Sequence, residues 1–430
     1  MVNKLIRFFY QVDNINTKKI LITYLVYALA IILCSIVYGY FLNIKFKIYD
    51  ENYNIIFDNI SFSNGELINN LYTKGEYYVY INKIKFVLAK TPAIPLLIFF
   101  ISLISKNFFF IIIFKNILIF TVYFYFILKI IAKINKSFFF LLTLLMVPIF
   151  IPYNFSVSLN FFYEDSLVAI FLPLIFLATI SNYKYKYEFV GVIIFILYFI
   201  KTSMLPIAII IPILIIFLEK KITRFIPIIC AVAAILTWGL YGLNKTGRFP
   251  VFNASSSINS YVLSSVMNIN FHKYYPNKST DLIPATNKLP QKIIDEWEFY
   301  DFYKQENDTY LYKNFDRYVK DIIIKLKFIF FGISRDGAFP DNNGNFDNNI
   351  RFSSIISKAL LNLSILISLF FIVKNLKKLN IVKTEIYFLS FIILSLLPHI
   401  LVWATSKHLV AISNISLIYL LFKFFKKNNA

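Results

Sequence analysis

Charged residues are scarce in this chain. Only 16% of its 430 residues are Asp, Glu, Lys or Arg, whereas 58% are hydrophobic and the mean hydropathy is +0.66. A soluble domain usually carries about 25% charged residues, so this composition excludes a water-facing globule of this size. The sequence predicts a polytopic membrane protein.

Cysteine, histidine and acidic residues are also few. The two cysteines, Cys34 and Cys230, lie in apolar runs, which excludes a disulfide framework and a thiolate metal site. The three histidines, His272, His399 and His408, show no metal-ligand spacing. Lys and Arg number 44 against 23 Asp and Glu, a net charge of +21. No zinc-finger or RNA-binding signature accompanies this excess, so nucleic acid is not an expected partner.

Long apolar runs are what the chain has in abundance. A spanning helix needs roughly 20 mostly apolar residues, and we expect an all-α fold with about ten such helices, nine to twelve being the range. The expected spans are 20–43, 108–128, 137–153, 166–182, 189–203, 204–218, 225–243, 355–373, 384–403 and 408–422. The first run is too long for a removable signal peptide and lacks a cleavage site.

The excess of basic residues predicts the orientation. Lys and Arg stay on the cytoplasmic side of short loops. With both termini cytoplasmic, the cytoplasmic segments hold 19 basic residues against four acids, while the opposite face is nearly balanced. We therefore expect an integral protein of a cell membrane, a bacterial inner membrane, with the excess charge on its cytoplasmic face.

One apolar region does not fit a simple span. Residues 93–114 are interrupted by Lys106, and the next run carries Lys115. Counting 93–114 as a span would move the basic cluster at 129–136 to the outer face, against the charge rule. We expect a short surface helix at 93–105, with Lys115 buried against neighbouring helices.

Two long polar segments remain, both on the outer face. They are the loop 44–92 and the segment 244–354, the latter long enough for a small cap domain and broken by prolines. The expected organisation is a cytoplasmic N-terminus at 1–19, a membrane module at 20–243 and the outer segment 244–354. The helices and basic tail at 355–430 complete it.

Acidic residues on the outer face are candidates for chemistry. Asp58 and Glu66 lie in the first loop, and Glu164 and Asp165 directly precede an apolar helix. Acids at a helix N-terminus are also favoured by the helix dipole alone, by about 0.3–1 kcal/mol. Because both groups lie on one face, their carboxylates could converge, and two outer carboxylates could hold a divalent cation, although no metal site is evident.

Cationic residues occur on the same face. Lys90 precedes Pro92, and Lys201 ends the fifth expected helix. Sugar transfer from a phosphate-linked donor needs a base for the acceptor and cations for the phosphate leaving group. Lys201 could equally be a lysine that extends to the interface, and His408 is either an interface residue or a further ligand.

Two short motifs resemble the GT-C superfamily of polytopic glycosyltransferases, which includes protein mannosyltransferases and lipid A aminoarabinose transferases. The stretch Asn70-Leu71-Tyr72-Thr73-Lys74-Gly75-Glu76-Tyr77 looks like that family's Asn-Leu loop element, one residue longer before the glycine. Lys90-Thr91-Pro92-Ala93-Ile94-Pro95 is similar to its "R-x-P-x-x-P" element, with Lys in place of Arg. The resemblance covers roughly 20–245.

The resemblance implies a function and roles for the candidate residues. It implies inverting transfer of a sugar from a polyprenyl-phosphate donor to a lipid, polysaccharide or protein acceptor on the outer face. Asp58 would be the catalytic base, with Glu66 as the alternative because Asp58 lies farther upstream than usual. Asp165, with Glu164 beside it, would be the second-loop acid.

The remaining role is to bind the donor phosphate. The resemblance assigns it to Lys90 and Lys201, with His408 as a further candidate. A transporter or flippase, or a polymerase or ligase, of lipid-linked saccharides is the alternative function. A transporter would be expected to carry ionisable residues near the membrane midplane and two related halves.

Overall fold

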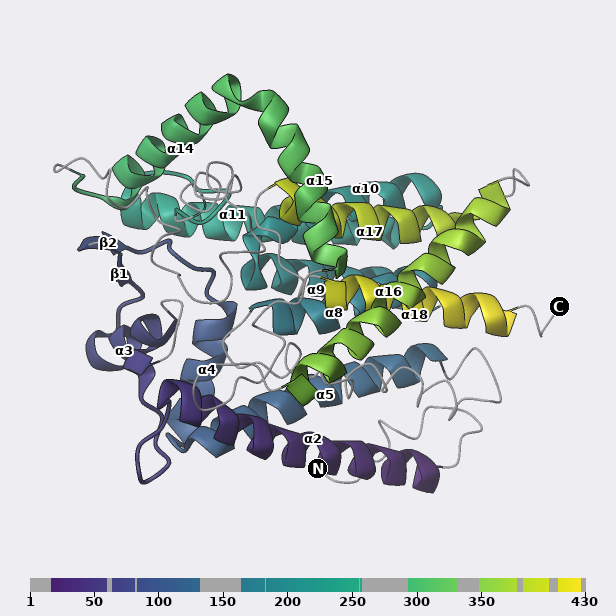
Figure 1. Ribbon diagram of the computed structural model, residues 1–430, viewed down its shortest axis with the longest axis horizontal. Helices are drawn as coiled ribbons and strands as arrows, with labels where there is room; N and C mark the ends of the chain where they lie inside the picture. Colours follow the sequence, from purple (N-terminus) through teal and green to yellow (C-terminus); the bar gives the residue numbers. More distant parts are fainter. Residues whose placement is uncertain are drawn as a thin grey trace.

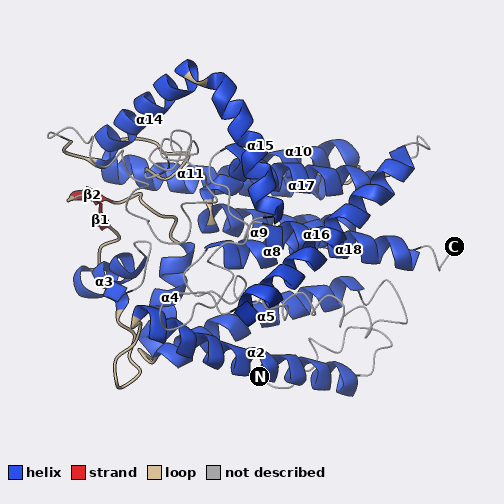
Figure 2. Ribbon diagram, in the orientation of Figure 1, coloured by secondary structure: helices blue, strands red, loops and turns tan. Residues whose placement is uncertain are grey.

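The computed structural model describes residues 17–59, 64–81, 83–131, 164–181, 183–254, 256, 293–331, 348–376, 382–401 and 409–426. Most of these residues are helical (Figure 2). The expected span 137–153, the ligand candidate His408 and the cytoplasmic N-terminus up to residue 16 lie outside the described residues.

The helices of the N-terminal half follow the apolar runs. They are α2 (Thr17–Phe46), α4 (Ala93–Ile104), α5 (Phe108–Ile131), α8 (Glu164–Ile180), α9 (Lys186–Ile200), α10 (Leu205–Leu218) and α11 (Ile226–Thr246). Short 3-10 turns, η2 (Thr202–Met204) and η3 (Ile222–Phe225), precede α10 and α11. Three helices of the C-terminal half also follow apolar runs. They are α16 (Asn348–Leu376), α17 (Lys383–Leu401) and α18 (Leu409–Lys426).

Among the described residues, four segments are long and apolar enough to cross a membrane. They are Ile20–Tyr40, Phe108–Leu128, Ile222–Thr246 and Lys383–Leu401. The other apolar helical stretches in the described part of the chain are shorter, between 10 and 17 residues, and in α16 and α18 they are only part of the helix. Ten spans therefore remain a prediction. The structure describes a helical protein with several membrane-length helices.

The region around Lys106 is divided as the sequence suggests. Helix α4 ends at Ile104 and α5 begins at Phe108, so Lys106 lies between two separate helices. The 12 residues of α4 span about 18 Å, which is too short to cross a membrane of about 30 Å. The side chain of Lys115 is buried in α5, with 1% of the residue exposed, as predicted.

The helices form a bundle with a polar cap at one end. Helix α9 packs against α11 and α8, α18 against α16 and α8, and α10 against α17. The cap contains η1 (Phe57–Asn59), α3 (Asn64–Lys74), the hairpin β1 (Val79–Ile81) and β2 (Ile84–Phe86), α14 (Glu296–Lys313) and part of α15 (Phe315–Phe331). In Figure 1 α3, the hairpin and α14 lie together at the left end of the bundle.

The two long polar segments pack on each other in this cap. Phe86 of the hairpin meets Phe299 of α14 edge to face, with 5.1 Å between the ring centroids. Both rings belong to a second, smaller hydrophobic core that also contains Trp238 of α11. Burial of these aromatic side chains joins segments about 200 residues apart into one unit.

The segment that follows α11 packs closely against the backbone of α11 at Gly242. A Cβ added at Gly242 would lie 2.3 Å from Cδ of Pro250, whose ring cannot rotate away. The segment after α11 is further held by Tyr198, whose hydroxyl donates to the Val251 carbonyl at 2.6 Å. The Ala254 amide in turn donates to the Leu88 carbonyl at 2.9 Å. This segment therefore supports the chain that leads to Lys90.

Gly242→Ala is expected to destabilise the protein by about 1–2 kcal/mol. Overpacking against Pro250 typically costs about 1–3 kcal/mol. The gain of about 1 kcal/mol from the better helix propensity of Ala offsets this cost only in part. Thermal unfolding in detergent would measure the effect. The double variant Gly242→Ala/Pro250→Ala should recover most of the loss, and a melting temperature unchanged in the single variant would contradict the close contact.

Candidate functional site

Two apolar helices bring three of the candidate residues to the cap end of the bundle. Helix α8 begins with Glu164 and Asp165, and the antiparallel helix α9 ends at Ile200. At Lys201 the backbone becomes extended, with φ −155° and ψ 108°, before η2 begins. The N-terminus of α8 and the C-terminus of α9 therefore place acids and a cation side by side.

Lys201 and Asp165 form a largely buried ion pair. The ammonium Nζ lies 2.6 Å from Oδ1 of Asp165, and the two side chains are only 16% and 10% exposed. A lysine that merely extended to the interface would keep its ammonium in water. The structure instead places this ammonium against a carboxylate, where the pairing offsets the cost of removing both charges from water.

A second ion pair lies next to the first. Nζ of Lys90 is 3.6 Å from Oε1 of Glu164, with side chains 27% and 20% exposed. Because Glu164 and Asp165 are consecutive, the two pairs form one cluster with no net charge. This cluster includes four of the residues that the sequence singled out.

Lys90 owes its position to a clamped backbone. The hydroxyl of Tyr77 donates to the Lys90 carbonyl at 3.1 Å, and Thr91 Oγ1 donates to the Ile200 carbonyl at 2.8 Å. Burial raises the pKa of Tyr77 well above its ordinary value, and Tyr241 and Glu164 add to the shift. Tyr77 therefore keeps its proton and remains a donor.

Glu296 of α14 holds the same segment from the other side. Its Oε2 accepts the amides of Val87 at 3.1 Å and Leu88 at 3.0 Å, and the residue is 3% exposed. Among the described residues Oε1 has no hydrogen-bond partner. Burial raises the pKa of Glu296 to about 7, Asp295 adds to the rise, and the two backbone bonds oppose it. The cap thus contains a carboxyl group that titrates near neutrality.

A pocket opens beside Asp165 within the helix bundle. Its lining comes from α8, η2, α17 and α18 and comprises Asp165, Val168, Leu172, Met204, Ser395, His399 and Ala411. His399 is 6% exposed and Ser395, one helical turn earlier, is 4% exposed. The pocket joins a carboxylate, an imidazole and a hydroxyl within apolar walls.

The sequence did not identify His399, Ser395, Tyr77 or Glu296 as site residues. His399 was considered only for metal spacing. The sequence does contain a signal for His399. It lies four positions after Ser395 and next to Pro398, and a polar residue there is unusual in an apolar helix. Glu296 lies in a charged stretch, and no sequence signature marks the amides about 200 residues earlier that it binds.

The two first-loop acids have contacts elsewhere in the cap. Asp58 accepts a hydrogen bond from the Asn69 side chain at 3.1 Å, and Glu66 accepts the Tyr80 amide at 2.8 Å. Neither acid forms an ion pair with Lys90 or Lys201 in the part of the chain that the structure describes. The expected convergence of first-loop and second-loop carboxylates is therefore not seen as direct contact.

The described residues contain no group of three or more His, Cys, Asp or Glu side chains that could hold a metal ion. The two ion pairs and the pocket beside Asp165 together offer carboxylates, ammonium groups and one imidazole. Such a set can bind a phosphate, accept a proton and exclude water.

Comparison of the chain with protein-family models, with curated proteins and with solved structures finds no match.

Proposed function

We propose that this protein is a membrane glycosyltransferase that moves a sugar from a polyprenyl-phosphate donor to a lipid, polysaccharide or protein acceptor. The observation that carries the proposal is the meeting of Lys90, Glu164, Asp165 and Lys201 at one end of an apolar bundle. These are the residues that the resemblance to GT-C enzymes assigns to the second-loop acid and the donor phosphate.

The proposed reaction distributes its charges over this cluster. The acceptor oxygen or nitrogen forms a bond to the anomeric carbon while the bond from that carbon to the phosphate oxygen breaks, with inversion. The acceptor proton passes to a carboxylate, and the phosphate leaves with the electron pair toward Lys90 and Lys201. Asp58 remains the proposed base and Glu66 its alternative, and Asp165 holds Lys201.

The position of the cluster suits a substrate with a lipid tail and a polar head. It lies where apolar helices end and the polar cap begins, so a polyprenyl chain can stay in hydrocarbon while its phosphate reaches the lysines. Helices α8 to α10 contain 14 to 17 residues and are about 21–26 Å long. We propose that the cap faces the outside and that both termini are cytoplasmic, as the charge distribution suggests.

Lys201→Ala is expected to weaken donor binding about tenfold or more, and Lys201→Arg to weaken it less. A hydrogen bond to a charged group contributes about 1.5–3 kcal/mol, and Arg retains a cation that can contact both Asp165 and a phosphate. Purified protein in detergent, titrated with a polyprenyl monophosphate, gives the affinities. Equal affinities of the Ala and wild-type proteins would contradict a role in phosphate binding.

Transfer itself tests the proposal. Protein reconstituted in vesicles with a polyprenyl-phosphate sugar carrying a radiolabel should move the label to an acceptor present in envelope extract. Lys245→Ser, which removes an exposed cation from the last turn of α11, is the control that should retain transfer. Movement of the labelled lipid across the bilayer with no new product would favour the alternative.

That alternative, transport of a lipid-linked saccharide, has one observation in its favour. Lys115 is buried inside a helix long enough to cross a membrane, and the next residue, Asn116, donates to Ser35 of α2 at 2.9 Å. Buried ionisable groups within a span often mark a transport pathway. The same reconstituted assay distinguishes the two functions.

A further inference from the structure

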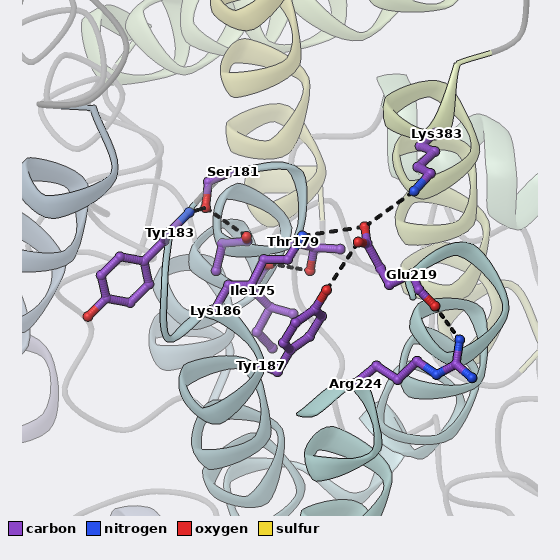
Figure 3. Close-up of polar contacts among 10 residues, drawn as sticks. Ile175, Thr179, Ser181, Tyr183, Lys186, Tyr187, Glu219, Arg224 and Lys383 are labelled. Atoms are coloured by element: carbon purple, nitrogen blue, oxygen red, sulfur yellow. Dashed lines mark hydrogen bonds and ion pairs between the residues drawn. The ribbon is translucent and has the colours of Figure 1, made fainter. Parts of the chain in front are cut away.

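The opposite end of the bundle carries a second charged cluster, centred on Glu219. Oε2 of Glu219 accepts the Tyr187 hydroxyl at 3.1 Å, and Oε1 lies 3.3 Å from Nζ of Lys186 and 3.9 Å from Nζ of Lys383. Arg224 donates to the backbone carbonyl of Glu219. Figure 3 shows Glu219 in the middle of this group, with side chains that come from the starts of α9 and α17 and from η3.

This cluster has an excess of positive charge. Five cations surround or adjoin Glu219, and they are Lys186, Lys220, Lys221, Arg224 and Lys383. The acidic side chains in the first turns of α9 and α17 are Glu188 and Glu385, and Glu385 pairs with a further cation, Lys423. Lys220 and Lys221 are exposed, and the Lys383 side chain is 56% exposed. Nε of Arg224 is buried and has no hydrogen-bond partner among the described residues. An anion can therefore bind here and be partly neutralised.

Large apolar side chains border the same cations. Phe217 and Ile222, which flank Lys220 and Lys221, are 80% and 83% exposed, and Ile229 on the first turn of α11 is 63% exposed. The guanidinium of Arg224 lies 5.1 Å from the centre of the Phe225 ring. Such exposure is unfavourable in water but favourable against acyl chains.

The depth of the cluster agrees with a membrane interface. It lies at the start of α9, about 22 Å along that helix from Lys201, and apolar helices fill the distance between the two ends. Exposed lysines directly beside exposed Phe and Ile side chains therefore lie where headgroups meet hydrocarbon.

We propose that the segment Phe217–Ile222, together with Lys383, binds the headgroup of an anionic phospholipid. The phosphate pairs with Lys220, Lys221 and Lys383, and the acyl chains cover Phe217 and Ile222. The site is separate from the Lys90 and Lys201 cluster, and it does not depend on the proposed glycosyl transfer. It also explains why the connection between α10 and η3 exposes apolar and basic side chains together.

Lipid binding to the purified protein tests this site. Native mass spectrometry in neutral detergent, with phosphatidylglycerol or phosphatidylcholine added, counts retained lipids and gives their affinities. We expect the wild type to retain phosphatidylglycerol preferentially. Lys220→Ser/Lys221→Ser should lower that affinity about thirtyfold, because each basic residue near a membrane surface contributes about 1 kcal/mol to binding of anionic lipid.

The control removes the same charge from the other end of the molecule. Lys245→Ser/Lys304→Ser takes away two exposed cations, one in the last turn of α11 and one on α14, and should leave the lipid preference unchanged. Equal affinity of the wild type for both lipids, or the same loss in both double variants, would overturn the site. Competition by inorganic phosphate at the lipid's concentration would show a free-phosphate site instead of a lipid site.

Discussion

Asp165→Asn is expected to abolish glycosyl transfer and also to destabilise the protein by about 3–5 kcal/mol. The stability loss follows from burial, because the Lys201 side chain is only 16% exposed and would lose the carboxylate that lies 2.6 Å away. Removing one partner of a buried ion pair leaves an uncompensated charge, which accounts for a cost of that size. The loss of transfer follows because Lys201 would no longer be held at the proposed phosphate site.

A double variant separates the two effects. Asp165→Asn/Lys201→Met removes both charges and replaces them with groups of similar size, so most of the stability should return. Transfer should stay absent, because the phosphate loses a cation. Recovery of transfer together with stability would mean that this ion pair has only a structural role.

The exposed pair of Lys85 and Glu76 supplies the matched control. Their side chains are 47% and 59% exposed, and 3.0 Å separates Nζ from Oε2. Glu76→Gln should change the stability little, because exposed ion pairs contribute little, and should leave transfer intact. A loss in this variant as large as in Asp165→Asn would indicate a general sensitivity to charge instead of a site.

The helices could be predicted from the sequence because apolar runs of sufficient length specify them locally. Lys106 and Pro92 were enough to indicate a short helix between two breaks, and α4 is such a helix. The number of spans was harder to predict. Helices α8 to α10 have 14 to 17 residues, and length alone does not decide whether such helices cross a membrane.

The site was only partly accessible to sequence reasoning. Glu164, Asp165 and Lys201 stood out because charge is rare beside long apolar runs, and helix directions then predict that they share one end. Which acid pairs with which lysine depends on the contact of α8 with α9 and on the clamp around Lys90. Both are tertiary features, and neither leaves a pattern in the local sequence.

Asp58 illustrates the limit of motif spacing. Its order along the chain suggested a base, yet order does not specify where a loop folds, and its described partner is Asn69 on α3. His399 illustrates the reverse case, because a residue dismissed for lacking a metal pattern lies in the pocket beside Asp165. A helix far away in sequence thus places an imidazole beside Asp165.

The two charged clusters differ in a way that suits different partners. The cluster at the cap balances two carboxylates against two ammonium groups and is largely enclosed. The cluster around Glu219 has surplus cations and exposed apolar neighbours. The first arrangement is suited to a reaction in which charge moves, and the second to a constant contact with lipid.

Glu296→Gln is expected to make the protein more stable than the wild type, and this difference should grow as the pH rises from 5 to 8. The pKa of Glu296 is raised to about 7 by burial, whereas a carboxyl group in the unfolded chain titrates near its ordinary value. Below that ordinary value Glu296 is protonated in both the folded and the unfolded state, so its raised pKa does not lower the free energy of unfolding. As the pH rises toward 7 the unfolded chain releases its proton first, so stability falls, by about 3 kcal/mol once both states are ionised.

Unfolding of the purified protein at several pH values measures this difference. The neutral amide of Gln keeps an oxygen for the amides of Val87 and Leu88 but carries no charge, so the gain of the variant over the wild type should grow to about 2–3 kcal/mol at pH 8. Glu298→Gln controls for the loss of one carboxylate, because Glu298 is exposed on the same helix. A gain that does not change with pH would contradict the burial of Glu296.

Because Glu296 holds the chain that leads to Lys90, Glu296→Leu should also weaken binding of a polyprenyl monophosphate, which links the pH response of the cap to the proposed site.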